Sequence, residues 1–363
     1  MFYIKTALQS GQCGSEGIFI DRCKEWFHQN YQVQHVFLTP SCTAALEMAA
    51  LITEINHGDE VIIPSWTHVS TANAFVLRGA KIVFADIDPE TMTINTEDVK
   101  RKISDRTKAI VAVHYGGYAA DVVLLRQLCD TKGIFLIEDA AHSIGAGIKG
   151  RLQGIVGHLG CLSFHETKNI QCGEGGALLV NDPRLAGTAE IVFEKGTDRS
   201  AFLRGEVSGY EWQRPGSSFA MSNITAAMLL AQLQETESVN EHRRILWYSY
   251  RKLLKKIRNF NSLFTLPPLP PAEEEFNAHI FFIKAVDANI ARKLVVDLNS
   301  DGIQAQFHYR PLHSSPYGSQ FEGLCQNTEL KCKRLIRLPL HSGMNENQVR
   351  RIVSVVEKLV KQK

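Results

Sequence analysis

The fold of this 363-residue chain is decided by the stretch Ser163-Phe164-His165-Glu166-Thr167-Lys168-Asn169, followed at once by Gly173-Glu174-Gly175-Gly176. An apolar run ending in Ile137-Glu138-Asp139 precedes it. Short runs of this kind, without polar alternation, predict strands that are buried on both faces. Two strands would therefore end in reactive side chains, the first in Asp139 and the second just before Lys168.

The same pattern extends outward along the chain. Short runs rich in Val and Ile alternate with amphipathic stretches, and the runs lie at 36–38, 61–63, 81–87, 109–114, 134–138, 161–164 and 177–180. Helices are expected between them, for instance at 43–55 and at 121–132, where Gly133 suits a left-handed cap. This order predicts an α/β fold with a mostly parallel, doubly wound, seven-stranded sheet.

Polar segments follow four of the predicted strands, at 39–43, 65–68, 139–142 and 163–168. Sites in doubly wound sheets lie beyond the carboxyl ends of the strands. We therefore expect these four segments to meet.

A second, smaller α/β domain is expected after residue 236. The helical spacing of 237–259 could carry the chain from a large domain at 1–236 to a small domain at 237–363. The proline-rich segment 266–271 must be exposed, because successive prolines cannot join a sheet. Beyond it the pattern predicts strands at 279–284 and 304–309 and helices at 290–299 and 345–360.

Composition excludes several classes of function. A hydrophobic share of 44% with 21% charged residues is typical of a folded globular protein, and a net charge of +2 gives no support for nucleic-acid or acidic-membrane binding. The apolar runs are too short to cross a bilayer, and the first residues lack the pattern of a signal peptide, so we expect a cytoplasmic protein. The eight cysteines include no C-x-x-C pair, so no metal site is expected.

Several motifs, taken in their order along the chain, resemble the nucleotide-sugar aminotransferases, the DegT/DnrJ/EryC1/StrS type within the aspartate-aminotransferase-like fold type I. These motifs lie at 39–46, 58–68, 139–142, 163–169, 173–176 and 308–313. Within that family, 42–79 and 163–181 are most similar to the transaminases that form dTDP-4-amino-4,6-dideoxygalactose. The resemblance implies pyridoxal 5′-phosphate (PLP) as cofactor, a dTDP-linked 4-keto-6-deoxyhexose and L-glutamate as substrates, and a homodimer with active sites at the subunit interface.

The resemblance assigns the central chemistry to Lys168 and Asp139. A lysine amine can form a Schiff base with an aldehyde and then move protons, and a carboxylate can hold the cofactor ring nitrogen protonated. Asp139 follows apolar residues, and burying a carboxylate is costly without a cationic partner such as a pyridinium. The alternatives are a solvated surface lysine and a helix-capping aspartate.

Other cofactor contacts follow from the same resemblance. The amide of Cys42, Thr43 at the start of a helix, and the Ser163 hydroxyl are expected to bind the phosphate, because a helix N-terminus offers free N–H groups. His68 would stack on the pyridine ring and His142 would lie beside the cofactor hydroxyl. Thr43 could instead be a plain N-cap, and His142 a satisfied structural histidine.

The expected substrate contacts are Gly11, Arg199, His308 and His313. Arginines 199, 204 and 310 are candidates for a carboxylate or a diphosphate, since guanidinium forms bidentate pairs with both, although each could be a solvated surface residue. The rival products are dTDP-viosamine, the gluco epimer, and a C3-aminated sugar. A non-catalytic relative is a further alternative, since Ala220 stands where the family carries an asparagine. An NAD-dependent oxidoreductase would need glycines that 39–45 lacks.

Overall fold

The computed structural model describes residues 2–362, and a seven-stranded sheet lies at its centre in the order β1-β9-β8-β5-β4-β2-β3. The strands are β1 (His35–Thr39), β2 (Glu60–Pro64), β3 (Lys81–Ala85), β4 (Thr107–Val113), β5 (Phe135–Asp139), β8 (Leu159–Ser163) and β9 (Gly176–Val180). Strands β3, β2, β4, β5 and β8 are parallel, and β9 runs antiparallel to both β8 and β1. Each predicted run therefore forms a strand, and the mostly parallel seven-stranded sheet is confirmed.

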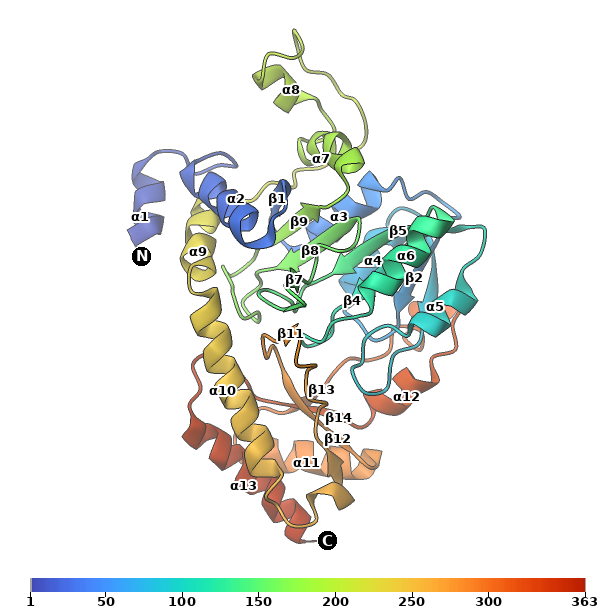
Figure 1. Cartoon of the computed structure of the whole chain (residues 1–363), viewed down its shortest axis with the longest axis vertical. Coiled ribbons are helices and arrows are strands. Elements are labelled where there is room, and N and C mark those ends of the chain that lie inside the picture. Colours follow the sequence, from blue (N-terminus) through green and yellow to red (C-terminus); the bar gives the residue numbers. More distant parts are fainter. Residues whose placement is uncertain (1, 363) are drawn as a thin grey trace.

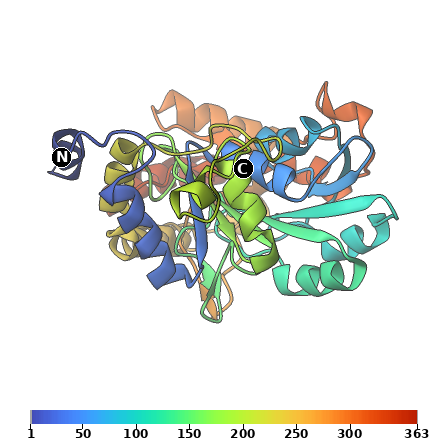
Figure 2. The ribbon, with the colours of Figure 1, turned by 90° about the horizontal axis from the view of Figure 1, so that it is seen from above.

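Helices cover both faces of this sheet (Figures 1 and 2). Successive strand residues point to opposite faces, so Val61 and Ile63 pack in one core cluster and Ile62 in another. On the Val61 face lie α3 (Cys42–Ile52), α4 (Val69–Val76) and α7 (Ala186–Phe193). On the other face lie α2 (Ile18–Tyr31), α5 (Thr96–Lys102), α6 (Val122–Lys132) and α9 (Asn223–Leu233).

The helix ends agree with the sequence in one case and correct it in another. α6 ends at Gly133, which has a φ of 66°, as the sequence predicts. α3 begins one residue earlier than expected, at Cys42, and Ser41 is its N-cap, accepting a hydrogen bond from the Ala44 N–H at 3.1 Å. The alternative that Thr43 is the N-cap is therefore wrong.

Helix α10 (Thr236–Leu254) runs from the large sheet to a four-stranded antiparallel sheet with the order β10-β12-β14-β13 (Figure 1). This sheet consists of β10 (Phe264–Thr265), β12 (Phe281–Ala285), β13 (Gln306–Phe307) and β14 (Leu335–Leu338). It is accompanied by α11 (Ala288–Ser300), α12 (Gln326–Cys332) and α13 (Glu346–Lys361). Its core also includes Trp66 and Tyr115. The division of the chain near residue 236 stays a prediction.

The remaining elements are short or peripheral. They are α1 (Phe2–Gln9), α8 (Arg199–Leu203), the 3₁₀ turns Pro183–Leu185, Phe260–Ser262 and Gly318–Gln320, and a small sheet of β6 (Gly147–Ile148), β7 (Arg151–Leu152) and β11 (Glu274–Glu275). α8 belongs to a segment that projects from the top of Figure 1 and exposes Leu203, Tyr210 and Trp212. Within residues 2–362, no helix is long and apolar enough to span a membrane.

Candidate active site

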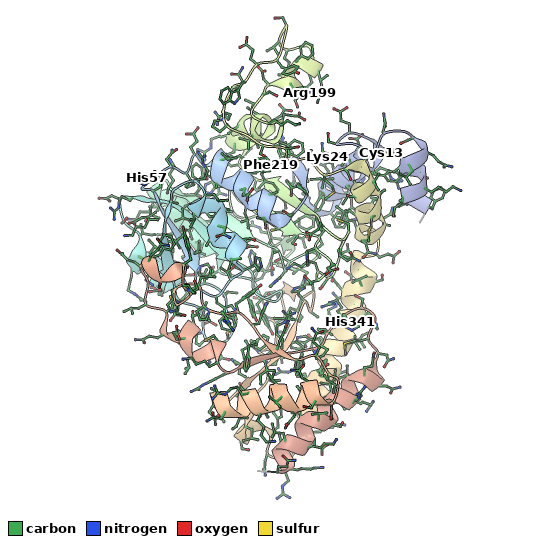
Figure 3. All side chains as sticks on the ribbon, turned by 180° about the vertical axis from the view of Figure 1, so that it is seen from behind. Cys13, Lys24, His57, Arg199, Phe219 and His341 are labelled. Carbon is green, nitrogen blue, oxygen red and sulfur yellow. The ribbon has the colours of Figure 1, made fainter. Side chains whose placement is uncertain are left out.

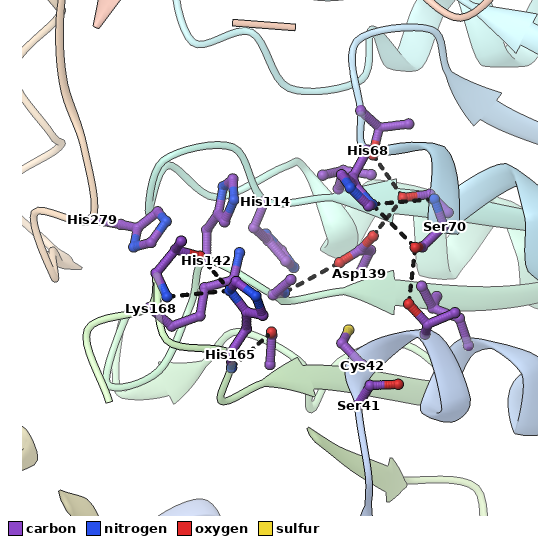
Figure 4. A pocket seen from close by; sticks show the side chains of 18 of the residues that line it. Ser41, Cys42, His68, Ser70, His114, Asp139, His142, His165, Lys168 and His279 are labelled. Atoms are coloured by element: carbon purple, nitrogen blue, oxygen red, sulfur yellow. Dashed lines mark hydrogen bonds between the residues drawn. The ribbon is translucent and has the colours of Figure 1, made fainter. Parts of the chain in front are cut away.

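The four polar segments predicted to meet do line one cavity, with a volume of about 420 Å³ (Figure 4). The predicted residues that line it are Cys42, Thr43, His68, Asp139, His142, Ser163, Lys168 and His308. They come from the ends of β1, β2, β5 and β8 and from the segment after β13. The convergence expected from the sequence is confirmed.

One glycine of the glycine-rich motif, Gly176, is required by a close backbone contact. A Cβ on Gly176 would lie 2.4 Å from the carbonyl carbon of Ser41 and 2.5 Å from the nitrogen of Cys42. Because β9 can pass so close to this turn only with a glycine, Gly176 allows β1 and β9 to pair there. Ser163 pairs with Gly176 in turn. The Ser163 hydroxyl is thereby held beside the N-terminus of α3.

The N-terminus of α3 faces the same cavity through Cys42 and Thr43. The first N–H groups of a helix have no partner within the helix, so they can bind an anion. The Thr43 hydroxyl donates a hydrogen bond to the Ser70 hydroxyl at 2.9 Å, which ties α3 to the start of α4. The free N–H groups at the start of α3 and the Ser163 hydroxyl can together hold a phosphate.

Lys168 lies in the turn that follows β8, where its backbone N–H donates to the His165 carbonyl at 2.9 Å. Burial lowers the pKa of the Lys168 amine from 10.5 to about 8, although the charge of the Asp139 carboxylate opposes this shift. No carboxylate among residues 2–362 forms an ion pair with this amine. A substantial fraction of the amine is therefore neutral near pH 8 and able to act as a nucleophile.

Asp139 is the last residue of β5 and is 5% exposed. Its Oδ2 accepts a hydrogen bond from the Thr71 hydroxyl at 2.7 Å, and its Oδ1 accepts one from the Ala141 N–H at 3.2 Å. No cationic side chain in the described part of the chain forms an ion pair with it. A buried carboxylate in this situation suits a ligand that carries a positively charged N–H.

Three histidines form one wall of the cavity. The rings of His142 and His279 stack with their centroids 4.3 Å apart, and burial lowers the pKa of both rings well below 6.5. Burial also lowers the pKa of His308, whose Nδ1 lies 2.9 Å from the Tyr115 hydroxyl. Because all three rings are neutral near pH 7, this wall adds hydrogen-bonding groups without adding charge.

His68 is the N-cap of α4, where its Nδ1 accepts a hydrogen bond from the Ser70 N–H at 3.3 Å. Desolvation lowers its pKa. The ring lies 6.5 Å from that of Tyr309, centroid to centroid. His68 and Tyr309 thus present two aromatic rings to the cavity.

Three of the four predicted substrate residues lie outside this cavity. Gly11 is exposed in the turn after α1, and Arg199 lies on the projecting segment (Figure 3), where it pairs with Glu16 at 3.1 Å. His313 lies 2.6 Å from the Ser65 hydroxyl and 3.1 Å from Glu329. Within one chain only His308 of this group reaches the cavity. The assignment of Gly11, Arg199 and His313 stays a prediction.

The sequence reasoning missed Arg337, Thr71 and His279, which all line the cavity. Arg337 lies on β14, and no ion pair of its guanidinium is found among the described residues. A signal was present in the sequence. Arg337 interrupts the apolar run 335–338, and a charged residue inside a buried strand indicates a function.

Comparisons with known proteins agree with this geometry. The family model of the DegT/DnrJ/EryC1/StrS aminotransferases matches residues 1–357. The crystal structure of the aminotransferase TlmJ from Streptoalloteichus hindustanus is similar, with a TM-score of 0.90 and 28% identity over 99% of this chain and 95% of that chain.

Two further structures are similar over nearly their whole length. An aminotransferase of the same family from Brucella abortus has a TM-score of 0.88 and 28% identity, covering 98% of this chain and 94% of that chain. Helicobacter pylori PseC, an aminotransferase involved in the biosynthesis of pseudoaminic acid, has a TM-score of 0.90 and 25% identity, covering 99% and 96%. The predicted fold type I architecture is confirmed.

Proposed function

Since the chain belongs to the DegT/DnrJ/EryC1/StrS aminotransferase family, we propose that it transfers an amino group from L-glutamate to C4 of a dTDP-linked 4-keto-6-deoxyhexose, giving dTDP-4-amino-4,6-dideoxygalactose. The membership supports a sugar aminotransferase and favours an enzyme over the non-catalytic alternative. The observation that carries the proposal is that the Lys168 amine and the Asp139 carboxylate face one cavity without pairing with each other.

The cofactor of this family is PLP, and the residues of the cavity fit it. A buried carboxylate without a cation suits a pyridinium nitrogen, a helix N-terminus suits a phosphate, and a lysine amine with a lowered pKa suits an aldehyde. When bound, PLP supplies an aldehyde that takes up the amino group and a ring that accepts electrons.

We assign the covalent attachment of the cofactor and the movement of the substrate Cα proton to Lys168. Its amine accepts that proton when neutral and returns one when charged, and a pKa of about 8 makes both forms accessible near neutral pH. Asp139 holds the proton on the ring nitrogen. Cys42, Thr43 and Ser163 would bind the phosphate, His68 would pack on the ring, and His142 would form a hydrogen bond with the ring hydroxyl.

For the amino donor we propose Arg337 as the carboxylate-binding residue. Its guanidinium lines the cavity together with Lys168, and it forms no ion pair with another described residue. The neighbouring imidazoles of His142, His279 and His308 are neutral, because burial lowers the pKa of each. Arg337 therefore offers a fixed positive charge on this wall and can pair with a carboxylate in bidentate geometry.

We further propose that the enzyme acts as a homodimer in the cytoplasm. A second copy would cover the projecting segment 197–213, whose Leu203 and Trp212 are 60% and 78% exposed. Large exposed apolar side chains gathered on one segment indicate an interface. A partner could bring Gly11 or Arg199 toward the sugar nucleotide, and this would reconcile their predicted role with their position outside the cavity.

The test is to incubate the PLP-loaded enzyme with L-glutamate and a panel of keto-sugar nucleotides, and to identify each product by NMR. The proposal expects 2-oxoglutarate together with the galacto 4-amino sugar, and no turnover by Lys168→Ala. If the product is the gluco epimer or a C3-aminated sugar, the proposed acceptor chemistry is wrong although the transaminase class stands. If every keto-sugar nucleotide is left unchanged, the substrate class is wrong.

A further inference from the structure

A chain of two threonine hydroxyls ends on the carboxylate assigned to the cofactor ring. The Thr71 Oγ1 donates to the Asp139 Oδ2 at 2.7 Å, and the Thr67 Oγ1 lies 2.7 Å from the Thr71 Oγ1. All three residues are buried, with exposures of 2% for Thr67, 0% for Thr71 and 5% for Asp139. Water is therefore largely excluded from this chain of hydrogen bonds.

The direction of the hydrogen bonds follows from the chemistry of the groups. A carboxylate only accepts, so the single hydroxyl proton of Thr71 goes to Asp139. The Thr71 oxygen must then accept from the Thr67 hydroxyl, its partner at 2.7 Å. Both donors in the chain thus point toward the carboxylate.

Thr71 does not make the contact that is usual for a threonine in a helix. Such a hydroxyl commonly bonds the carbonyl four residues back along the helix. Thr53 follows that rule, because its hydroxyl donates to the Ala49 carbonyl at 2.7 Å. Thr71 lies in the first turn of α4, where the residue four positions back, Thr67, precedes the helix, and its hydroxyl donates to Asp139 at the end of β5. This is therefore a tertiary contact between α4 and β5, not a contact within the helix.

The contact leaves the two carboxylate oxygens of Asp139 unequal. Oδ2 is engaged by Thr71 at 2.7 Å, whereas Oδ1 has only the longer contact of 3.2 Å from the Ala141 N–H. Two donors, one on each oxygen, also fix the rotation of the carboxylate about its last bond. Oδ1, which has the longer contact, is therefore the oxygen with the greater accepting capacity left.

We propose that Thr71 is a positioning residue whose hydroxyl, held by Thr67, orients the Asp139 carboxylate so that Oδ1 receives the N–H of the cofactor ring. The inference rests on the proposed role of Asp139. The segment 67–71 would then have a second function besides starting helix α4, because it would help to keep the cofactor ring nitrogen protonated.

The experiment uses protein loaded with PLP labelled with ¹⁵N in the ring and measures the ¹⁵N NMR shift of that nitrogen together with the dissociation constant of PLP. Thr71→Val replaces the hydroxyl by a methyl group of similar size, and we expect the shift to move toward that of unprotonated pyridine. A hydrogen bond to a charged group is lost, so PLP should bind about 10- to 100-fold more weakly. Thr71→Ser keeps the hydroxyl and should restore both values.

Two matched variants separate the possible explanations. Thr53→Val removes a buried hydroxyl that is remote from the carboxylate, so it should change neither the ¹⁵N shift nor the dissociation constant. Thr67→Val should have a smaller effect than Thr71→Val, because the Thr71 hydroxyl can still donate to Asp139. Thr71→Ala serves if the valine variant fails to fold. The inference is overturned if Asp139→Asn moves the ¹⁵N shift while the loaded Thr71 variants do not. If Asp139→Asn does not move it either, the proposed role of Asp139 fails first.

Discussion

Asp139, at the end of β5, and Lys168, in the turn after the neighbouring strand β8, face the same cavity, yet no ion pair joins them among residues 2–362. β5 ends at Asp139 and pairs in parallel with β8, which ends at Ser163, just before the turn that carries Lys168. The backbone thus holds an amine and a carboxylate on one cavity without letting them neutralise each other. Each remains available to a ligand that lies between them.

If Lys168 carries the cofactor, the loaded protein should be yellow, and borohydride should fix PLP to this residue alone. Lys168→Ala should lose the covalent link, and the missing proton transfer alone should slow turnover by about 10²–10⁴-fold. Mass spectrometry of the peptides after reduction checks the assignment. An adduct on another lysine would exclude Lys168.

Asp139→Asn tests the carboxylate while keeping its shape. The amide cannot hold a proton on the ring nitrogen by charge, so transamination should collapse while PLP still binds through its phosphate and Lys168. Single-turnover kinetics with glutamate and a separate PLP-binding measurement distinguish the two effects. An unchanged rate would mean that the aspartate is purely structural.

The lowered pKa of Lys168 predicts a distinctive pH profile for the protein without cofactor. A protonated amine cannot attack the aldehyde, so the rate of PLP capture should rise about tenfold per pH unit below the midpoint and level off above it. The midpoint should lie near the pKa of about 8 and well below 10.5, since burial disfavours the charged amine. Stopped-flow absorbance at a series of pH values measures it. A midpoint above 10 would show that the amine is solvated.

The His68 ring is assigned to stacking on the cofactor. His68→Phe should therefore retain PLP and most of the activity, because a flat apolar ring serves that purpose at least as well, and His68→Ala should release PLP more readily. The N-cap contact to Ser70 is lost in both variants, so their difference reports on the ring. If the phenylalanine variant is as inactive as the alanine variant, the imidazole has a chemical role instead.

The sequence was sufficient for the large sheet and for most of the cofactor side of the cavity. Runs of Val and Ile that are buried on both faces leave an unbroken apolar signature, and the reactive residues directly follow those runs, as Asp139 follows Ile137 and Glu138. The opposite wall was harder to predict. Arg337 and His279 are far from Lys168 in sequence, and only the packing of the small sheet against the large one brings them together.

Local spacing also could not reveal where the hydrogen bonds go. Thr67 and Thr71 are four residues apart, which is compatible with any helix start, and only the fold shows that Thr71 contacts Asp139. Conversely, Gly11 and Arg199 are expected substrate contacts but lie outside the cavity of a single chain. If a second copy brings them to the cavity, as we propose, that contact would leave no local signature in the sequence.

Arg337→Gln tests the binding of the amino donor. The variant keeps hydrogen-bonding groups but loses the charge and the bidentate geometry, so the KM for glutamate should rise about 10- to 100-fold, as expected for a lost charged hydrogen bond. The KM for the sugar nucleotide should change little, because the proposed contact is to the donor alone.

Arg337→Lys should recover only part of the loss, since an ammonium cannot bind a carboxylate in the same fork geometry. Arg258→Gln, at an exposed arginine outside the cavity, is the matched control and should leave both constants unchanged. Half-reactions followed separately, first with glutamate and then with the keto sugar, locate the effect. If only the second half-reaction is impaired, Arg337 contacts the sugar nucleotide, and the donor carboxylate must be bound elsewhere.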